Sequence, residues 1–285
     1  MQHRHVFALR GLSRSPMSRL AAPLVIALAS TITLPPPASA QADYRNLDAG
    51  RPIAVEDAQP LEFRALEFQF GIPRFSRERS GHWLYAFELE FKWGIFKDTH
   101  FGISSEFVVA HGAGRTVSSF ADTQLHLLYN FNEETPRFPA IAIRPELTVP
   151  TGGFSSGDVH GSLKLIASKT FGHNRIHFNG SWTAGPTATP GRGGELVTRY
   201  FYGLAYERTL PLKFLVLLAD VNAHRPIDNS PTEVAFEIGT RVQLTPGWVL
   251  DAGISTGRLR PSVGHDFGFV FGLSRSFSFR GLFPR

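Results

Sequence analysis

The chain has 285 residues, with 27 Gly, 20 Pro, 25 Phe and no Cys. The missing Cys excludes a disulfide-stapled extracellular scaffold, a thiol nucleophile and a Cys-based metal site. Of the 29 Lys and Arg, four lie in residues 1–40, which leaves 25 basic residues against 24 Asp and Glu. The high pI therefore belongs largely to the N-terminal segment, and we expect no nucleic-acid partner.

Residues 1–40 are predicted to be a secretory signal peptide. Four Arg precede an apolar run over 20–34, and Ala38-Ser39-Ala40 forms a small-residue cleavage site. The alternative, an uncleaved anchor helix, is disfavoured because the run is short and closes in three prolines. We expect cleavage after Ala40, with either Met1 or Met17 as the start. Residues 41–60 then form an irregular lead-in, in the periplasm or in a barrel lumen.

The run WLYAFELEFKW (83–93) alternates strictly between an aromatic face and a face that carries Glu88, Glu90 and Lys92. A period of two predicts a β-strand. Ten residue steps tilted by about 40° climb roughly 26 Å, which matches the apolar band of an outer-membrane barrel with aromatic residues at each boundary. The predicted aromatic girdle consists of Trp83, Trp93, Trp182 and Trp248.

The same alternation recurs in 61–285. It predicts an all-β fold, a transmembrane antiparallel up-and-down β-barrel of about twelve strands. The expected strands are 61–71, 81–93, 99–110, 120–131, 138–149, 159–171, 174–184, 196–208, 211–221, 232–244, 247–257 and 264–277.

The predicted connections alternate in length. Those after even strands are short, whereas those after odd strands are mostly longer and rich in Gly, Pro and Ser. The long ones are 111–119, 185–195, 222–231 and 257–266. Short periplasmic turns and long external loops are typical of outer-membrane barrels, and this parity places both termini in the periplasm.

One strand breaks the pattern. In the ninth, Val216 and Leu218 are predicted to face outward, but Leu217 and Val221 are apolar on the other face. Either part of the lumen is apolar or the register differs there.

Several runs resemble a large bacterial family of outer-membrane transporters related to a phenol meta-pathway degradation protein (MetA-type). They are IRPELTVPTGGFSSG (143–157), LKLIASKTFG (163–172), GLAYERTL (203–210) and the lead-in over 51–71. The resemblance covers most of the mature chain. It implies an outer-membrane barrel with a passive transport role, and its motifs do not define a cargo.

The polar faces of the predicted strands supply candidate lumen residues. They are Glu67, Glu88, Glu90, Glu106, His126, Arg144, Glu146, Lys164, His177, Arg199, Glu207, Glu237 and Arg241. Such groups set selectivity in a wet channel. Alternatively, they pair across neighbouring strands and fill a narrow barrel. The loop TGGFSSG (151–157) is interpreted as a turn, with a substrate gate as the alternative.

An enzyme is not expected. His160 and Ser162 have the spacing of an outer-membrane phospholipase pair, but they share a face with Lys164 that points away from lipid. Outside the predicted signal peptide, no HxH or HExxH spacing supports a metal site, and no cofactor is predicted.

The leading hypothesis is a passive channel for small, hydrophobic or aromatic molecules in the outer membrane of a Gram-negative bacterium. Its expected partners are the lipid bilayer, the barrel-assembly machinery and an unidentified small cargo. The competing hypothesis is a structural or surface-interaction barrel with a plugged lumen.

Overall fold

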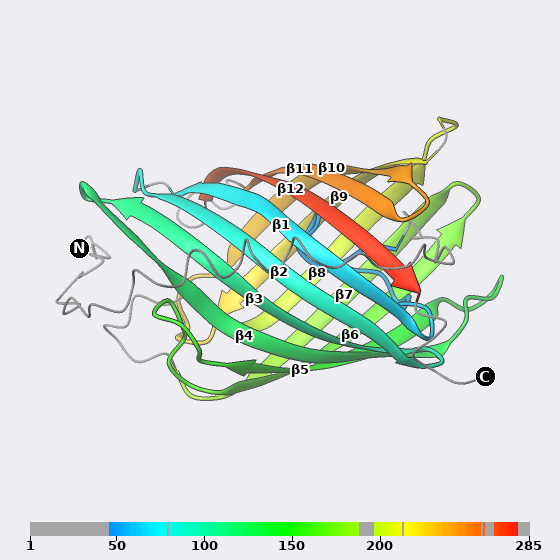
Figure 1. Cartoon of the computed structure of the whole chain (residues 1–285), viewed down its shortest axis with the longest axis horizontal. Helices are drawn as coiled ribbons and strands as arrows, with labels where there is room; N and C mark the ends of the chain where they lie inside the picture. Colours follow the sequence, from blue (N-terminus) through cyan, green and yellow to red (C-terminus); the bar gives the residue numbers. More distant parts are fainter. Residues whose placement is uncertain are drawn as a thin grey trace, which may run out of the picture.

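The computed structural model describes residues 46–78, 80–187, 197–212, 214–257, 259 and 265–278. The chain forms a closed barrel in which each strand pairs antiparallel with its neighbour in sequence, and β1 closes the ring against β12 (Figure 1). The strands are β1 Ala65–Glu78, β2 Trp83–Phe96, β3 Thr99–Gly112, β4 Arg115–Asn132, β5 Ala140–Val149, β6 His160–Phe171, β7 Asn174–Ala184, β8 Thr198–Thr209, β9 Leu215–Pro226, β10 Glu233–Thr245, β11 Trp248–Thr256 and β12 His265–Ser278. The predicted twelve-stranded up-and-down barrel is confirmed.

The apolar side chains of the strands face outward. Leu89, Leu204 and Ile254 are 53%, 51% and 64% exposed, whereas residues that alternate with them, such as Glu90 and Ala205, are buried inside the barrel. Exposing this surface to water would be unfavourable, because burying apolar area stabilises a fold by roughly 25 cal/mol per Å². The arrangement is that of a transmembrane barrel, with lipid outside and polar groups inside. The described residues contain no helix that is long and apolar enough to cross a membrane.

The two ends of the barrel differ. The connections after even strands are 97–98, 133–139, 172–173, 210–214 and 246–247, and we call this the short-turn end. The opposite, long-loop end carries 79–82, 113–114, 150–159, 185–197, 227–232 and 257–264. β1 begins and β12 finishes at the short-turn end, so both termini of the barrel lie there.

Several predicted boundaries are wrong. Residues 111–119 are not a long loop, because β3 and β4 extend to a two-residue hairpin at Ala113-Gly114, where both φ angles are positive. That conformation matches the twist of paired strands and lets the ladder continue to its tip. β9 likewise runs to Pro226, so its loop is shorter than 222–231, and β1 starts at Ala65 rather than at residue 61. The predicted signal peptide, residues 1–40, and most of 185–195 lie outside the described part of the chain.

Candidate functional site: a coil inside the barrel

Residues 46–64, which we call the lumen coil, lie inside the barrel. Pro52 approaches β10 and β11, and Ala54 and Val55 contact β10 and β9. Further along, Glu56 meets β7, Ala58 meets β6 and β4, and Leu61 meets β3. The coil therefore passes the strands in descending order, winding around the inner wall before it leads into β1.

The backbone of the coil is bound by side chains of the wall. The N–H groups of Ala54, Val55 and Glu56 donate to Glu237 Oε2 (2.5 Å), Asp220 Oδ2 (3.1 Å) and Asn179 Oδ1 (2.9 Å). Asn179 Nδ2 donates back to the Glu56 carbonyl at 2.8 Å. These bonds satisfy groups that would otherwise be buried without partners in a segment that forms no sheet.

Glu56 lies in a cluster of charged side chains in the lumen. Arg144 Nη1 donates to its two carboxylate oxygens at 3.0 and 2.9 Å, and Lys164 Nζ donates at 2.6 Å. Glu56 is 5% exposed. Burial would raise the pKa of Glu56, but the two cations outweigh burial and lower that pKa to about 2. The carboxylate is therefore ionised at neutral pH.

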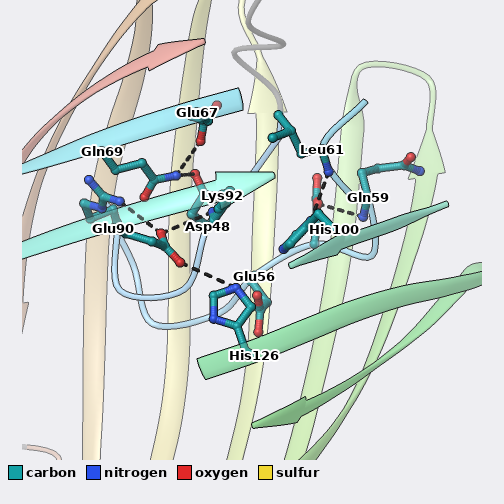
Figure 2. A network of polar contacts seen from close by, with 12 residues as sticks. Asp48, Glu56, Gln59, Leu61, Glu67, Gln69, Glu90, Lys92, His100 and His126 are labelled. Carbon is teal, nitrogen blue, oxygen red and sulfur yellow. Dashed lines mark hydrogen bonds and ion pairs between the residues drawn. The ribbon is translucent and has the colours of Figure 1, made fainter. Parts of the chain in front are cut away.

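Other ion pairs hold the start of the coil. Asp48 contacts Lys92 and accepts from Gln69 Nε2 at 2.8 Å and Arg241 Nη2 at 3.1 Å. Figure 2 shows Asp48, Gln69 and Lys92 converging beside Glu90. Glu90 also accepts from Arg51 Nη2 at 3.4 Å, the one of these contacts in which the coil supplies the cation.

Apolar packing supplements the polar contacts. Ile53 and Val55 of the coil are buried against Val216 and Leu218 of β9 and against Phe201 of β8. Val216 and Leu218 therefore face the lumen, and the prediction that they face outward is wrong. Leu217 and Val221 face lipid instead, at 44% and 42% exposure. The strand is apolar on both faces because its inner face packs on the coil.

Glycines in the wall make room for the coil. A Cβ placed on Gly239 would lie 2.6 Å from Pro52 Cγ, and one on Gly253 would lie 2.5 Å from the Pro52 carbonyl oxygen. A Cβ on Gly272 would lie 2.9 Å from Arg51 Cδ, and one on Gly203 would overlap Val55. The four glycines lie on β8, β10, β11 and β12, and together they form what we call the glycine groove. The coil fits there because these positions carry no side chain.

The predicted lumen residues lie on the inner wall, largely paired with one another or with the coil. Arg144 also bonds Glu146 at 2.9 Å, and Arg241 bonds Asp251 at 2.5 Å. His126 lies 3.6 Å from Glu90, and His177 lies 3.3 Å from Glu207. Toward the long-loop end, Glu88 and Glu106 line a small cavity, and Arg199 donates to the Thr183 carbonyl. Near the short-turn end, Glu67 accepts a hydrogen bond from Ser276.

The four tryptophans divide between the two ends. Trp83, opposite His111, and Trp182, opposite Tyr200, lie toward the long-loop end. Trp93, opposite Phe101, and Trp248, opposite Arg275, lie toward the short-turn end. Arg77 stacks over Trp83 and Arg275 over Trp248, which gives both boundaries a cation beside an aromatic ring.

The predicted turn 151–157 has an additional contact. The N–H of Phe154 donates to the Phe120 carbonyl at 3.1 Å, and Phe154 packs beside the inward residues Ala86, Val108 and Ala121. The loop therefore folds over the inner wall of β4 near the long-loop end.

Two serine–histidine arrangements face the interior. His160 is 1% exposed and contacts the Pro186 carbonyl at 3.0 Å, and Ser162 pairs with Glu146 and Thr183 in the ladder. At the long-loop end, Ser255 Oγ lies 2.8 Å from His265 Nε2, and His265 Nδ1 lies 3.0 Å from Glu233 Oε1. Ser255 belongs to a strand paired on both sides, so the neighbouring backbone N–H groups are positioned for the ladder and not for an oxyanion.

A cavity of about 400 Å³ lies at the short-turn end. Asp48, Asp57 and Glu67 line it together with Arg175 and Arg241. The cavity is mixed in charge and lies below the lumen coil.

Sequence reasoning missed the coil residues Asp48, Glu56 and Asp57. Their signal was available: three acids lie among apolar residues in a lead-in that precedes a barrel with several inward cations. Without a period, however, the lead-in gives no basis for assigning which acid meets which strand.

No family model and no curated protein matches the sequence. The fold is similar to that of the outer membrane channel from Pseudomonas putida F1, with a TM-score of 0.53 and 11% identity over 78% of this chain and 98% of that chain. The KdgM porin has a TM-score of 0.44 at 10% identity, over 76% of this chain and 99% of its own. The NanC porin has a TM-score of 0.46 at 11% identity, over 75% of this chain and 100% of its own. At these identities the likeness establishes the barrel fold alone.

Proposed function

We propose that the protein is an outer-membrane channel for small molecules and that the lumen coil closes it. The observation that carries the proposal is the glycine groove formed by Gly203, Gly239, Gly253 and Gly272. A barrel built only as a scaffold can fill its interior with side chains of its own wall. Here the wall leaves space, and a removable segment held by hydrogen bonds and ion pairs occupies it.

The outer membrane is part of the same proposal. The predicted signal peptide over 1–40, the lipid-facing surface and the resemblance to the phenol meta-pathway family all favour it. The short-turn end is then periplasmic, and the coil enters the lumen from the periplasm. Insertion would use the barrel-assembly machinery, and the cargo would be a small molecule.

A reversible lock tests whether the coil closes the channel. A Cβ at Gly203 would overlap Val55 Cγ2 of the coil, and the chain has no native Cys, so V55C/G203C would place two thiols within disulfide reach. We expect planar bilayers with the oxidised variant to be sealed and conductance to appear on reduction. The single variants V55C and G203C control for the substitutions themselves.

The occupied lumen also suits the second candidate, a structural or surface-interaction barrel. That candidate predicts a sealed barrel in the wild type, in the reduced variant and at every applied voltage. Conductance that depends on the redox state of the lock would contradict it.

A further inference from the structure

We propose that the wall site around Arg144 and Lys164 is the cargo site of the channel, that it binds a carboxylate, and that Glu56 occupies it in the closed state. This inference rests on the proposed channel function and names the chemical class of the cargo: a small anion with a carboxylate a short chain away from an amide.

Two largely buried cations surround the carboxylate of Glu56. Arg144 Nη1 lies within hydrogen-bond distance of both Glu56 oxygens, and Lys164 Nζ lies 2.6 Å from one of them. The side chains of Arg144 and Lys164 are 8% and 16% exposed. Buried charge-assisted contacts of this length are the strong, selective ones.

Withdrawal of the coil changes the ion-pair partners of Arg144 and Lys164. Arg144 keeps its wall partner Glu146, whereas Lys164 has, among the described ion pairs, no carboxylate other than Glu56. A cation in a narrow lumen without a partner is costly, because removing one member of a buried pair leaves the other uncompensated. An anionic solute that replaces Glu56 removes this cost, so the vacated site favours carboxylates over neutral molecules.

The side-chain amide of Asn179 binds the Glu56 backbone beside the carboxylate site. Asn179 accepts the Glu56 N–H at 2.9 Å and donates to the Glu56 carbonyl at 2.8 Å. The wall thus binds the backbone and the side chain of one residue together. A ligand with the same two groups, spaced as in glutamate, satisfies Asn179, Arg144 and Lys164 at once.

Elsewhere on the inner wall, cations also pair with carboxylates of the coil. The coil brings Asp48 and Asp57 as well, and these meet Lys92, Arg241 and Arg175. Withdrawal of the coil removes four carboxylates, those of Asp48, Glu56, Asp57 and Glu62, and only two guanidiniums, those of Arg51 and Arg64. The open lumen is therefore more positive than the closed one, which favours entry of anions.

The test uses the full-length protein carrying E56Q, in which the coil no longer supplies the anion. Equilibrium dialysis in detergent compares N-acetyl-L-glutamate α-amide with N-acetyl-L-glutamine α-amide, which differ only in the terminal carboxylate. We expect the glutamate compound to bind about tenfold more tightly, the scale of one charge-assisted contact.

Two further variants identify the site. E56Q/K164Q should lose the preference, whereas E56Q/K169Q should keep it, because Lys169 lies on the same strand but bonds Glu134 in the turn 133–139. Equal binding of the two amides by E56Q, or a preference that survives K164Q, overturns the inference. A selective site in a barrel that never conducts would instead contradict the proposed channel and leave the carboxylate site standing.

Discussion

The carboxylate of Glu56 connects the coil to β5 and β6 at once, and its ionisation decides how firmly the coil is held. Its pKa falls from the ordinary 4.5 to about 2, so its contribution is complete above about pH 4.5 and is lost as the pH falls toward 2. We expect wild-type bilayer conductance to be unchanged between about pH 7 and 5 and to rise only below about pH 3.

The variant E56Q should conduct at neutral pH and should lack this acid-induced rise. Removing one member of a buried ion pair costs about 3 kcal/mol, or about 100-fold in occupancy of the closed state. A wild-type conductance that already rises at pH 6 would show that another group controls the coil.

At the residue scale the sequence predicts the wall better than it predicts the site. Arg144 and Lys164 could be assigned to the interior because they alternate with lipid-facing Ile143 and Leu165. Their shared partner could not be identified, since Glu56 lies in an irregular segment more than 80 residues away in the chain. Pairing across such a distance depends on the closed barrel and not on local pattern.

At the scale of the elements, the fit between coil and groove depends on glycine. G239A adds a methyl group that would lie 2.6 Å from Pro52 Cγ, which forces the coil away from β10. We expect higher basal conductance in bilayers and faster cleavage of the coil by an added protease. G161A is the matched control, because a Cβ at Gly161 meets nothing within 4 Å. Identical traces for the two variants would contradict the role assigned to the groove.

β9 shows why an element can be found and still be assigned to the wrong face. Its apolar residues predict a strand, and the structure contains one, but Leu217 and Val221 face lipid while Val216 and Leu218 face the coil. Alternation identifies the faces only when one of them is polar. Here the second face is apolar because it packs against Ile53 and Val55, which lie in a different element.

At the scale of the whole molecule, closure of the barrel depends on the seam between β1 and β12. Phe75 is 2% exposed and lies 4.8 Å from the Phe269 ring and 4.7 Å from the Trp83 ring, measured between centroids. F75A should remove the contact across the seam, with Phe269 of β12, and the contact on the other side of β1, with Trp83 of β2, each worth about 1 kcal/mol. We expect a lower temperature for the heat-induced shift on a semi-native gel.

F96A provides the comparison, because Phe96 is 66% exposed at the end of β2. It should leave that temperature nearly unchanged. If F75A and F96A shifted equally, the seam would not be a weak point of the barrel.

The number of strands and their order could be predicted because each strand is locally periodic and each turn joins sequential neighbours. Loop length was less predictable, as the hairpin at Ala113-Gly114 shows, since polar residues such as Thr116 and Ser118 occur in strands as well as in loops. The lead-in was predicted to lie in the periplasm or in the lumen, but the sequence could not decide between the two places, because the contacts of the lead-in depend on the space enclosed by all strands together.

Asn46, the first residue that the structure describes, and Ala65, where β1 begins after the coil, both border the cavity at the short-turn end. It can therefore be withdrawn through that mouth as a loop, with no free terminus threaded through the bore. Traction on the chain upstream of Asn46 would load Asp48 first, then Arg51, and only later Glu56. Contacts loaded one after another yield to a far smaller force than the same contacts sheared together, so a weak pull at the short-turn end would suffice to withdraw the coil.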